Sequence, residues 1–170
     1  LKLDFGNSYR TGKPVFDDIF MRLPVSIKVA FLGMLLATVM GLPLGVLSAV
    51  KQYSPADSFL RVASTVLVAM PTFWLAMLLI LVFALYLGWL PAGGALTWQS
   101  YILPTITVGV PYGSKVLRMT RSTMLEEIRQ DYVRTARSKG VPEKKVIYGH
   151  ALKNALLPVI TTIGSAFGAI

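Results

Sequence analysis

The chain has 170 residues, of which 17 are Lys or Arg and 8 are Asp or Glu, so its formal net charge is +9. Hydrophobic residues make up 54% of it and charged residues only 15%, against about 25% charged residues in a typical soluble domain. This composition disfavours an ordinary soluble enzyme. The aromatic and β-branched content excludes a disordered chain, and the absence of Cys excludes disulfides and thiolate metal sites.

The charges are unevenly distributed. No Asp, Glu, Lys or Arg occurs in residues 29–50 or 62–114, and a water-facing surface could hardly be built from such runs. Ten of the basic residues lie instead within residues 115–153, directly after the apolar stretches. The positive-inside rule of membrane proteins accounts for this block. A nucleic-acid surface is disfavoured, because no repeat of aromatic and basic residues typical of base stacking accompanies it.

The first 23 residues form a polar segment of mixed charge. The segment has neither a basic region before an apolar core nor a cleavage site, so it is not a signal peptide. We expect residues 1–23 to be extracytoplasmic. Because the chain also stops at Ile170 within an apolar run, we expect it to be the interior of a longer membrane protein, cut at both ends.

The first predicted membrane span covers residues 24–50, because about 20 apolar residues in a helix cross a bilayer core. Lys28 lies near one end, where its long side chain reaches the interface. Gly41 and Gly45 have the spacing that permits close helix contact, and Pro43 between them permits a kink. We interpret these residues as packing elements rather than as direct participants in transport.

A short polar turn, residues 51–61, leads into the second predicted span, residues 61–88. The sequence of Ser54 to Asp57 is typical of a turn that opens a helix. Pro71 and Thr72 divide this span, so we expect a bend there.

An uncharged loop follows over residues 89–101, with Trp89 and Trp98 as interfacial aromatic residues. The third predicted span covers residues 102–121, but only its first 13 residues, up to Ser114, are uncharged. If this segment crosses the membrane, residues 51–61 share a side with the basic block, as the positive-inside rule prefers.

The sequence thus predicts an all-α, polytopic transmembrane helical bundle over residues 24–170. It places residues 122–154 in a cytoplasmic loop, and a fourth span begins near Ala155.

Within the loop, residues 126–139 read as one amphipathic helix whose acidic residues precede its basic ones, as the helix dipole favours. Gly140 is typical of a helix stop, and Pro142 suits the first turn of a second short helix that ends near Asn154. The apolar faces of both helices need cover. They either pack on the membrane ends of the chain itself or dock into a groove of a cytoplasmic partner, and the residues leave both possibilities open.

Two stretches of this loop resemble the loop of permease subunits of ABC-type importers, which reads E-A-A-x-x-x-G and, nine residues later, I-x-L-P. The matching stretches here are Arg134-Thr135-Ala136-Arg137-Ser138-Lys139-Gly140 and, nine residues later, His150-Ala151-Leu152-Lys153. Ala136, Gly140 and Leu152 agree with this general pattern, whereas Arg134, Thr135, His150 and Lys153 depart from it. The longer stretches DYVRTARSKG and HALKNALLPV resemble the dipeptide, oligopeptide and nickel permeases, whose loop reads Y-x-x-T-A-R-x-K-G and H-A-x-x-N. Four further stretches are similar to sequences of the same group, namely RLPVSIKVA, GLPLGVLSA, MPTFWLAMLLI and LGWLPAGG. The resemblance therefore covers nearly the whole chain.

The resemblance implies a type I ABC importer permease-like fold in which this loop couples the permease to an ATPase. It assigns the coupling role to Tyr132, Thr135, Ala136, Arg137, Gly140, Val141, Val146, Ile147, His150, Leu152 and Asn154. Gly140 would set the corner between the loop helices, because a side chain there opposes the left-handed conformation. ATP-driven closure of the ATPase would push the loop and shift the permease between inward-open and outward-open states.

The resemblance also implies the partners. These are a second permease subunit in a heterodimer, two cytoplasmic ATP-binding subunits and an extracytoplasmic solute-binding protein that meets residues 1–23 and 89–101. The location would be the plasma (inner) membrane of a bacterium or archaeon. The solute, which is a dipeptide, an oligopeptide, a nickel complex or a related molecule, stays open.

We expect no catalytic residue, cofactor or metal site, since the chain has no P-loop for ATP. We interpret the single His, His150, as structural. A secondary transporter driven by an ion gradient is the alternative, but such proteins usually carry ionisable residues inside their spans, and residues 62–114 have none. A membrane enzyme would need a catalytic group at membrane depth, and no H-E-x-x-H or G-x-S-x-G motif occurs.

Overall fold

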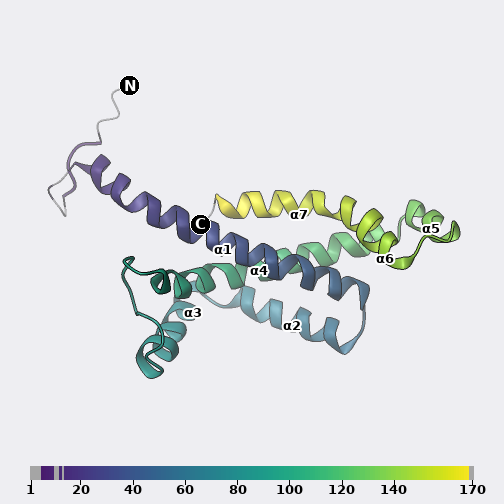
Figure 1. The fold of residues 1–170 in the computed structure, drawn as a ribbon, viewed down its shortest axis with the longest axis horizontal. Helices are drawn as coiled ribbons and strands as arrows, with labels where there is room; N and C mark the ends of the chain where they lie inside the picture. The colour runs from purple at the N-terminus through teal and green to yellow at the C-terminus, as the bar shows by residue number, and fades with distance from the viewer. Residues whose placement is uncertain (1–4, 10–11, 13, 169–170) are drawn as a thin grey trace.

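The computed structural model describes residues 5–9, 12 and 14–168, and these form the helical arrangement of Figure 1. In chain order the elements are α1 (Val15–Val50), α2 (Pro55–Ala69), α3 (Thr72–Leu79), η1 (Ile80–Tyr86), η2 (Trp98–Tyr101), α4 (Ile102–Ile128), α5 (Asp131–Ser138), α6 (Glu143–Lys145), η3 (Val146–Ala151) and α7 (Leu152–Phe167). Among the described residues the extended pairing is limited to an isolated bridge between Asn7 and Pro14. The predicted all-α fold is confirmed.

α1 begins well before the first predicted span. Its first turn contains Asp17 and Asp18, where the helix dipole stabilises carboxylates. The helix continues across the boundary expected between residues 23 and 24, and Pro24 lies inside it, as membrane helices tolerate. Part of the predicted segment 1–23 lies outside the described residues.

α1 and α4 pack so closely that glycine is required at their contact. A Cβ atom on Gly41 would lie 2.5 Å from the carbonyl oxygen of Gly113, and one on Gly45 would lie 2.7 Å from the carbonyl oxygen of Leu117. Real side chains do not approach a backbone oxygen so closely, so a larger residue at either position would push the helices apart. The prediction that Gly41 and Gly45 mediate close helix packing is confirmed.

The bend predicted at Pro71 is present. α2 ends at Ala69, Pro71 is extended with ψ of 133°, and the helical run that starts at Thr72 is turned by 99° from α2. The predicted opening of α2 is also present, because the side chain of Ser54 accepts a hydrogen bond from the amide of Asp57. The sequence therefore placed the break, but the helix starts at Pro55, within the polar turn predicted over residues 51–61.

α4 is the central helix of the fold, since it packs against α1, α2, α3 and α7 (Figure 1). By length and apolar composition, residues 15–50 and 143–168 qualify as membrane spans, and the bent run from α2 to η1 would be a third. α4 is 27 residues long, but its basic and polar residues lower its hydropathy. The crossing of the membrane by residues 102–121 therefore stays a prediction.

The single helix predicted over residues 126–139 is divided in two. α4 ends at Ile128, and Gln130 is extended with ψ of 151° before α5 begins at Asp131. Asp131 thereby occupies the first turn of a new helix, where its carboxylate complements the dipole. The break could not be predicted from the sequence, because apolar positions continue at helical spacing on both sides of it.

The second predicted loop helix is not a separate element. Residues 143–168 form one helical run, so the helix expected to end near Asn154 continues directly into the segment expected from Ala155. Pro158 lies inside α7 instead of opening it. A displacement of the first turns of this run is thus carried into its apolar part without an intervening hinge loop.

We predict that Gly41→Ala destabilises the protein, because the added methyl group meets the carbonyl oxygen of Gly113. Overpacking costs about 1–3 kcal/mol, whereas Ala in an open helical position is up to about 1 kcal/mol better than Gly. Gly164→Ala in α7 is the matched control, since no atom lies within 4 Å of its added Cβ. The melting temperature should fall for the first variant and stay or rise for the second. Equal melting temperatures would contradict the tight contact.

Candidate functional site: the loop between α4 and α7

The loop between α4 and α7 turns a sharp corner at Gly140, at the end of the molecule away from the N-terminus (Figure 1). Gly140 has φ of 76°, a left-handed conformation that favours glycine. The amide of Gly140 donates to the carbonyl of Arg137 at 2.9 Å, and the amide of Val141 donates to the carbonyl of Ala136 at 3.2 Å. This pair of bonds is the Schellman motif of a helix end. The predicted helix stop at Gly140 is confirmed.

The apolar face of the loop is buried within this chain. Ala136, Val146 and Ile147 belong to one buried cluster with Val46 and Ala49 from the end of α1. The other buried members are Met124, Val133, Ala151 and Ala155, and the partly buried Leu125, Ile128, Val141 and Leu152 pack against them. Of the two possibilities that the sequence left open, the structure favours packing of these faces on the helix ends of the chain itself.

The outer face of the loop is polar and exposed. Of the predicted coupling residues, the exposed ones are Tyr132, Thr135, Arg137, Gly140 and Asn154, and His150 is half-buried. Tyr148, which the sequence analysis did not single out, is 61% exposed on the same loop. The sequence feature that could have indicated Tyr148 is an aromatic residue close to Lys144 and Lys145 within the predicted second helix. The predicted residues thus divide into a buried support and an exposed surface.

An ion pair closes the corner from outside. Arg137 Nε donates to Glu143 Oε2 at 3.1 Å, and Arg137 Nη2 donates to Glu143 Oε1 at 2.8 Å. The guanidinium lowers the pKa of the Glu143 carboxyl, against a smaller opposing effect of burial, and the carboxylate raises the pKa of Arg137. Because both side chains are substantially exposed, this pair contributes orientation more than stability.

Tyr132 connects the three helical parts of the loop. Its hydroxyl donates to a carboxylate oxygen of Glu127 at the end of α4, and the side chain of Asn154 in α7 lies close enough to influence its pKa. Burial is the main cause that raises the pKa of Tyr132, and the Glu127 carboxylate adds to it, while Asn154 acts in the opposite direction. Tyr132 and Asn154, two of the predicted residues, are therefore brought together.

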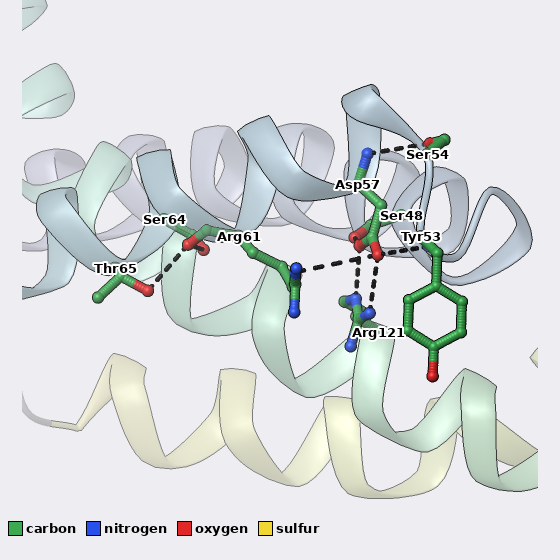
Figure 2. A network of polar contacts seen from close by, with 8 residues as sticks. All are labelled: Ser48, Tyr53, Ser54, Asp57, Arg61, Ser64, Thr65 and Arg121. Carbon is green, nitrogen blue, oxygen red and sulfur yellow. Dashed lines mark hydrogen bonds and ion pairs between the residues drawn. The ribbon is translucent and has the colours of Figure 1, made fainter.

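A buried ion pair beneath the loop was missed by the sequence analysis (Figure 2). Arg121 Nε donates to Asp57 Oδ1 at 2.7 Å, and Arg121 Nη2 donates to Asp57 Oδ2 at 2.9 Å. The Ser48 hydroxyl donates to Oδ1 at 2.5 Å, and the amide of Tyr53 donates to Oδ2 at 3.0 Å. One carboxylate thus ties together the end of α1, the start of α2 and the second half of α4.

The environment of Asp57 favours its charged form. The side chain is fully buried, and it lies in the first turn of α2, ahead of the predicted span 61–88. The hydrogen-bonded guanidinium of Arg121 holds the pKa of this carboxyl well below its usual range, although burial acts in the opposite direction. The signal in the sequence was its isolation, because Asp57 is the one acidic residue between Asp18 and Glu126. An acid alone in such a long stretch needs a basic partner.

Within the part of the chain that the structure describes, no group of three or more His, Asp or Glu side chains is placed to hold a metal ion. The loop offers packing, charge and hydrogen bonds, which suit mechanical contact with another protein.

Comparison with known proteins identifies relatives of the chain. Residues 41–170 match the family described as binding-protein-dependent transport system inner membrane component. The chain is 39% identical over 165 residues to the glutathione transport system permease protein GsiC of Escherichia coli (strain K12), which covers 97% of the chain and 54% of that relative. It is 38% identical over 168 residues to GsiC of Salmonella typhimurium (strain LT2), and the aligned residues make up 99% of the chain and 55% of that relative. The chain spans about half the length of the curated relatives it matches.

We predict that Asp57→Asn destabilises the protein by about 3 kcal/mol, because it leaves the Arg121 guanidinium without its counter-charge. The effect lies at the lower end of the usual range, since the Arg121 side chain is 17% exposed. Arg134→Gln is the matched control. Its ion pair with Asp131 joins side chains that are 80% and 86% exposed, so its removal should change the free energy of unfolding by less than about 0.5 kcal/mol. Similar losses in chemical unfolding of both variants would contradict the assignment.

The same ion pair predicts a pH dependence. Because the pKa of Asp57 is lower in the folded than in the unfolded protein, the folded state binds fewer protons. The stabilisation is therefore complete above the unfolded pKa of about 3.9 and is lost as the pH falls toward the folded pKa. Melting temperatures of the wild type and Asp57→Asn should differ by a constant amount between about pH 5 and 8 and converge below about pH 4. A gap that widens in acid would refute this account.

Proposed function

The chain belongs to the family of binding-protein-dependent transport system inner membrane components, and on this premise we propose that its α4–α7 loop couples an ATPase to solute import. Its relatives are non-catalytic permease components of ABC transport systems, and the chain is likewise a multi-pass protein of the plasma membrane without an active site of its own. The motif resemblance noted in the sequence is confirmed by this membership.

The shape of the loop is the observation that carries the proposal. α5 projects from the bundle (Figure 1), while its side chains of Val133 and Ala136 pack into the cluster with Val46 and Ala49 of α1. An element fixed at its base and exposed at its tip transmits a push instead of absorbing it. This is the mechanical property that a coupling loop requires.

A force applied to the loop by an ATPase would reach the bundle through two helices. On one side α4 approaches the loop, separated from α5 only by the break at Arg129 and Gln130. On the other side the helical run of residues 143–168 is continuous. A contact that moves the corner therefore moves both helices. Nucleotide binding to an ATPase would thereby bias the permease between inward-open and outward-open states, as a ligand biases any equilibrium that it binds unequally.

The exposed surface of the loop suits an acidic groove. Residues 131–145 contain five basic residues and two acidic ones, a net charge of +3 (5 − 2). Tyr132 and Tyr148 add two partly exposed aromatic rings, and tyrosine is a frequent anchor of protein interfaces. Charge complementarity would steer the ATPase to this end, and the rings would hold it there.

The remaining partners follow from the same role. An importer of this kind would contain two cytoplasmic ATP-binding subunits, a second permease in a heterodimer and an extracytoplasmic solute-binding protein. The loop would be cytoplasmic, and residues 1–23 and 89–101 would face the binding protein. Since the relatives are named as glutathione transport permeases, we propose a short peptide or peptide-like solute, with dipeptides, oligopeptides and nickel complexes as the related candidates.

The proposal is tested with the full-length permease and its partner subunits reconstituted in proteoliposomes. We expect uptake of glutathione or a short peptide only in the presence of ATP and the binding protein. Uptake that continues without ATP and collapses when the ion gradient is dissipated would overturn the proposal.

We predict that Gly140→Val reduces ATP-driven uptake by about tenfold or more, because a β-branched residue opposes the left-handed conformation and redirects the second half of the loop. Gly149→Val is the matched control. Gly149 is exposed in the same loop, has no positive φ, and its added Cβ would meet only a flexible lysine side chain at 3.6 Å. Both variants should insert normally into the membrane. Full uptake by Gly140→Val would show that the corner is not needed for coupling.

A further inference from the structure

A basic cavity of 300 Å³ lies between α2 and α4, apart from the coupling loop. It is lined by Arg61, Ser64, Thr65, Leu117, Arg118, Arg121 and Ser122, none of which is acidic. Figure 2 shows Arg61, Ser64 and Thr65 on α2, with Arg121 reaching from α4 toward the same region. Three guanidinium groups from two helices therefore converge on one small polar space.

The positive charge of this cavity is only partly neutralised. Asp57 satisfies Arg121 with two hydrogen bonds but approaches Arg61 no closer than 3.9 Å. Arg118 is exposed and has no ion pair or hydrogen bond with the residues that the structure describes. The three arginines and one carboxylate leave a net charge of +2 (3 − 1) at the cavity.

The hydrogen-bonding groups are arranged to receive an acceptor. The hydroxyls of Ser64 and Thr65 are occupied, because both donate to the carbonyl of Arg61. The Ser122 hydroxyl, one turn of α4 beyond Arg118, is exposed and makes no hydrogen bond with other described residues. Two arginine forks and one free hydroxyl supply donors for the several oxygens of one phosphate group, which guanidinium groups bind in bidentate fashion.

The position of the cavity indicates where such an anion comes from. Arg61 is the last charged residue before the uncharged stretch of residues 62–114, and Arg118 follows closely after its end. α2 and α4 pack against each other, and Arg61 and Arg118 line the same cavity, so the two ends of this stretch lie side by side. The cavity thus marks the level at which both helices change from charged to apolar, which is the level of lipid headgroups.

We propose that this cavity binds the phosphate of an anionic phospholipid between Arg61, Arg118 and Ser122. Basic pockets between membrane helices are suited to such headgroups, and Leu117 supplies an apolar wall toward the acyl chains. The lipid holds α2 to α4 from the outside, as Asp57 holds them from within. This site does not depend on ATPase coupling, so the two proposals succeed or fail separately.

The test uses the full-length permease in nanodiscs of phosphatidylcholine and phosphatidylglycerol, with the phosphatidylglycerol that stays bound after extraction counted by native mass spectrometry. Arg118→Gln should lower retention about five- to tenfold, as expected for loss of one arginine contact at a membrane surface. Ser122→Ala should lower it less. Arg134→Gln is the control with the same change of charge, at an exposed arginine of α5 that pairs with Asp131, and it should retain the lipid fully.

A second arm distinguishes the lipid from soluble phosphate. Inorganic phosphate is titrated against the same permease in nanodiscs of phosphatidylcholine alone. Saturable phosphate binding that Arg118→Gln abolishes, without retention of phosphatidylglycerol, would overturn the lipid assignment. Equal retention of phosphatidylglycerol by the wild type and Arg118→Gln would overturn the site itself.

Discussion

The close approach of α1 to α4 through glycine is the contact on which the rest of the structure depends. Between membrane helices the hydrophobic effect gives little net drive, because lipid is as apolar as the side chains, so shape must supply the attraction. Gly41 and Gly45 bring the α1 backbone against the carbonyl groups of α4. The next turn of α1 then carries Val46 and Ala49 into the cluster beneath the loop. The base of the candidate coupling site is therefore set by a helix crossing that begins one turn away.

The ion pair of Asp57 and Arg121 extends this constraint to a third helix. Glycine packing fixes α1 on α4, but α2 leaves α1 through a short turn and would be free to swing. The carboxylate of Asp57 fastens it, because Ser48, Tyr53 and Arg121 all donate to that one group. Such a pair repays its desolvation only when every oxygen is satisfied, and here each oxygen accepts two hydrogen bonds. Packing and charge thus act on the same end of the bundle, the end from which the loop projects.

Features with a local cause were predictable from the sequence, whereas features with a distant partner were not. Pro71 bends the chain and Gly140 ends a helix because their own backbones require it, and both predictions are confirmed. The break at Gln130 escaped detection because no Gly or Pro marks it. The pairing of Asp57 with Arg121 spans 64 positions, so no periodicity reveals it. Only the isolation of Asp57 among uncharged and basic residues pointed to an unseen partner.

The structure also explains why this loop matches the general permease pattern at some positions and departs from it at others. The agreeing residues are Ala136, which is buried and accepts the bond that closes the corner, Gly140, which has positive φ, and Leu152, which packs against the buried cluster. Three of the departing residues, Arg134, Thr135 and Lys153, are exposed, and His150 is half-buried. The shared positions therefore encode the shape of the corner, which any coupling loop of this design needs. The departures fall mainly on the exposed surface that we propose as the ATPase contact, where charge and shape would decide which subunit fits.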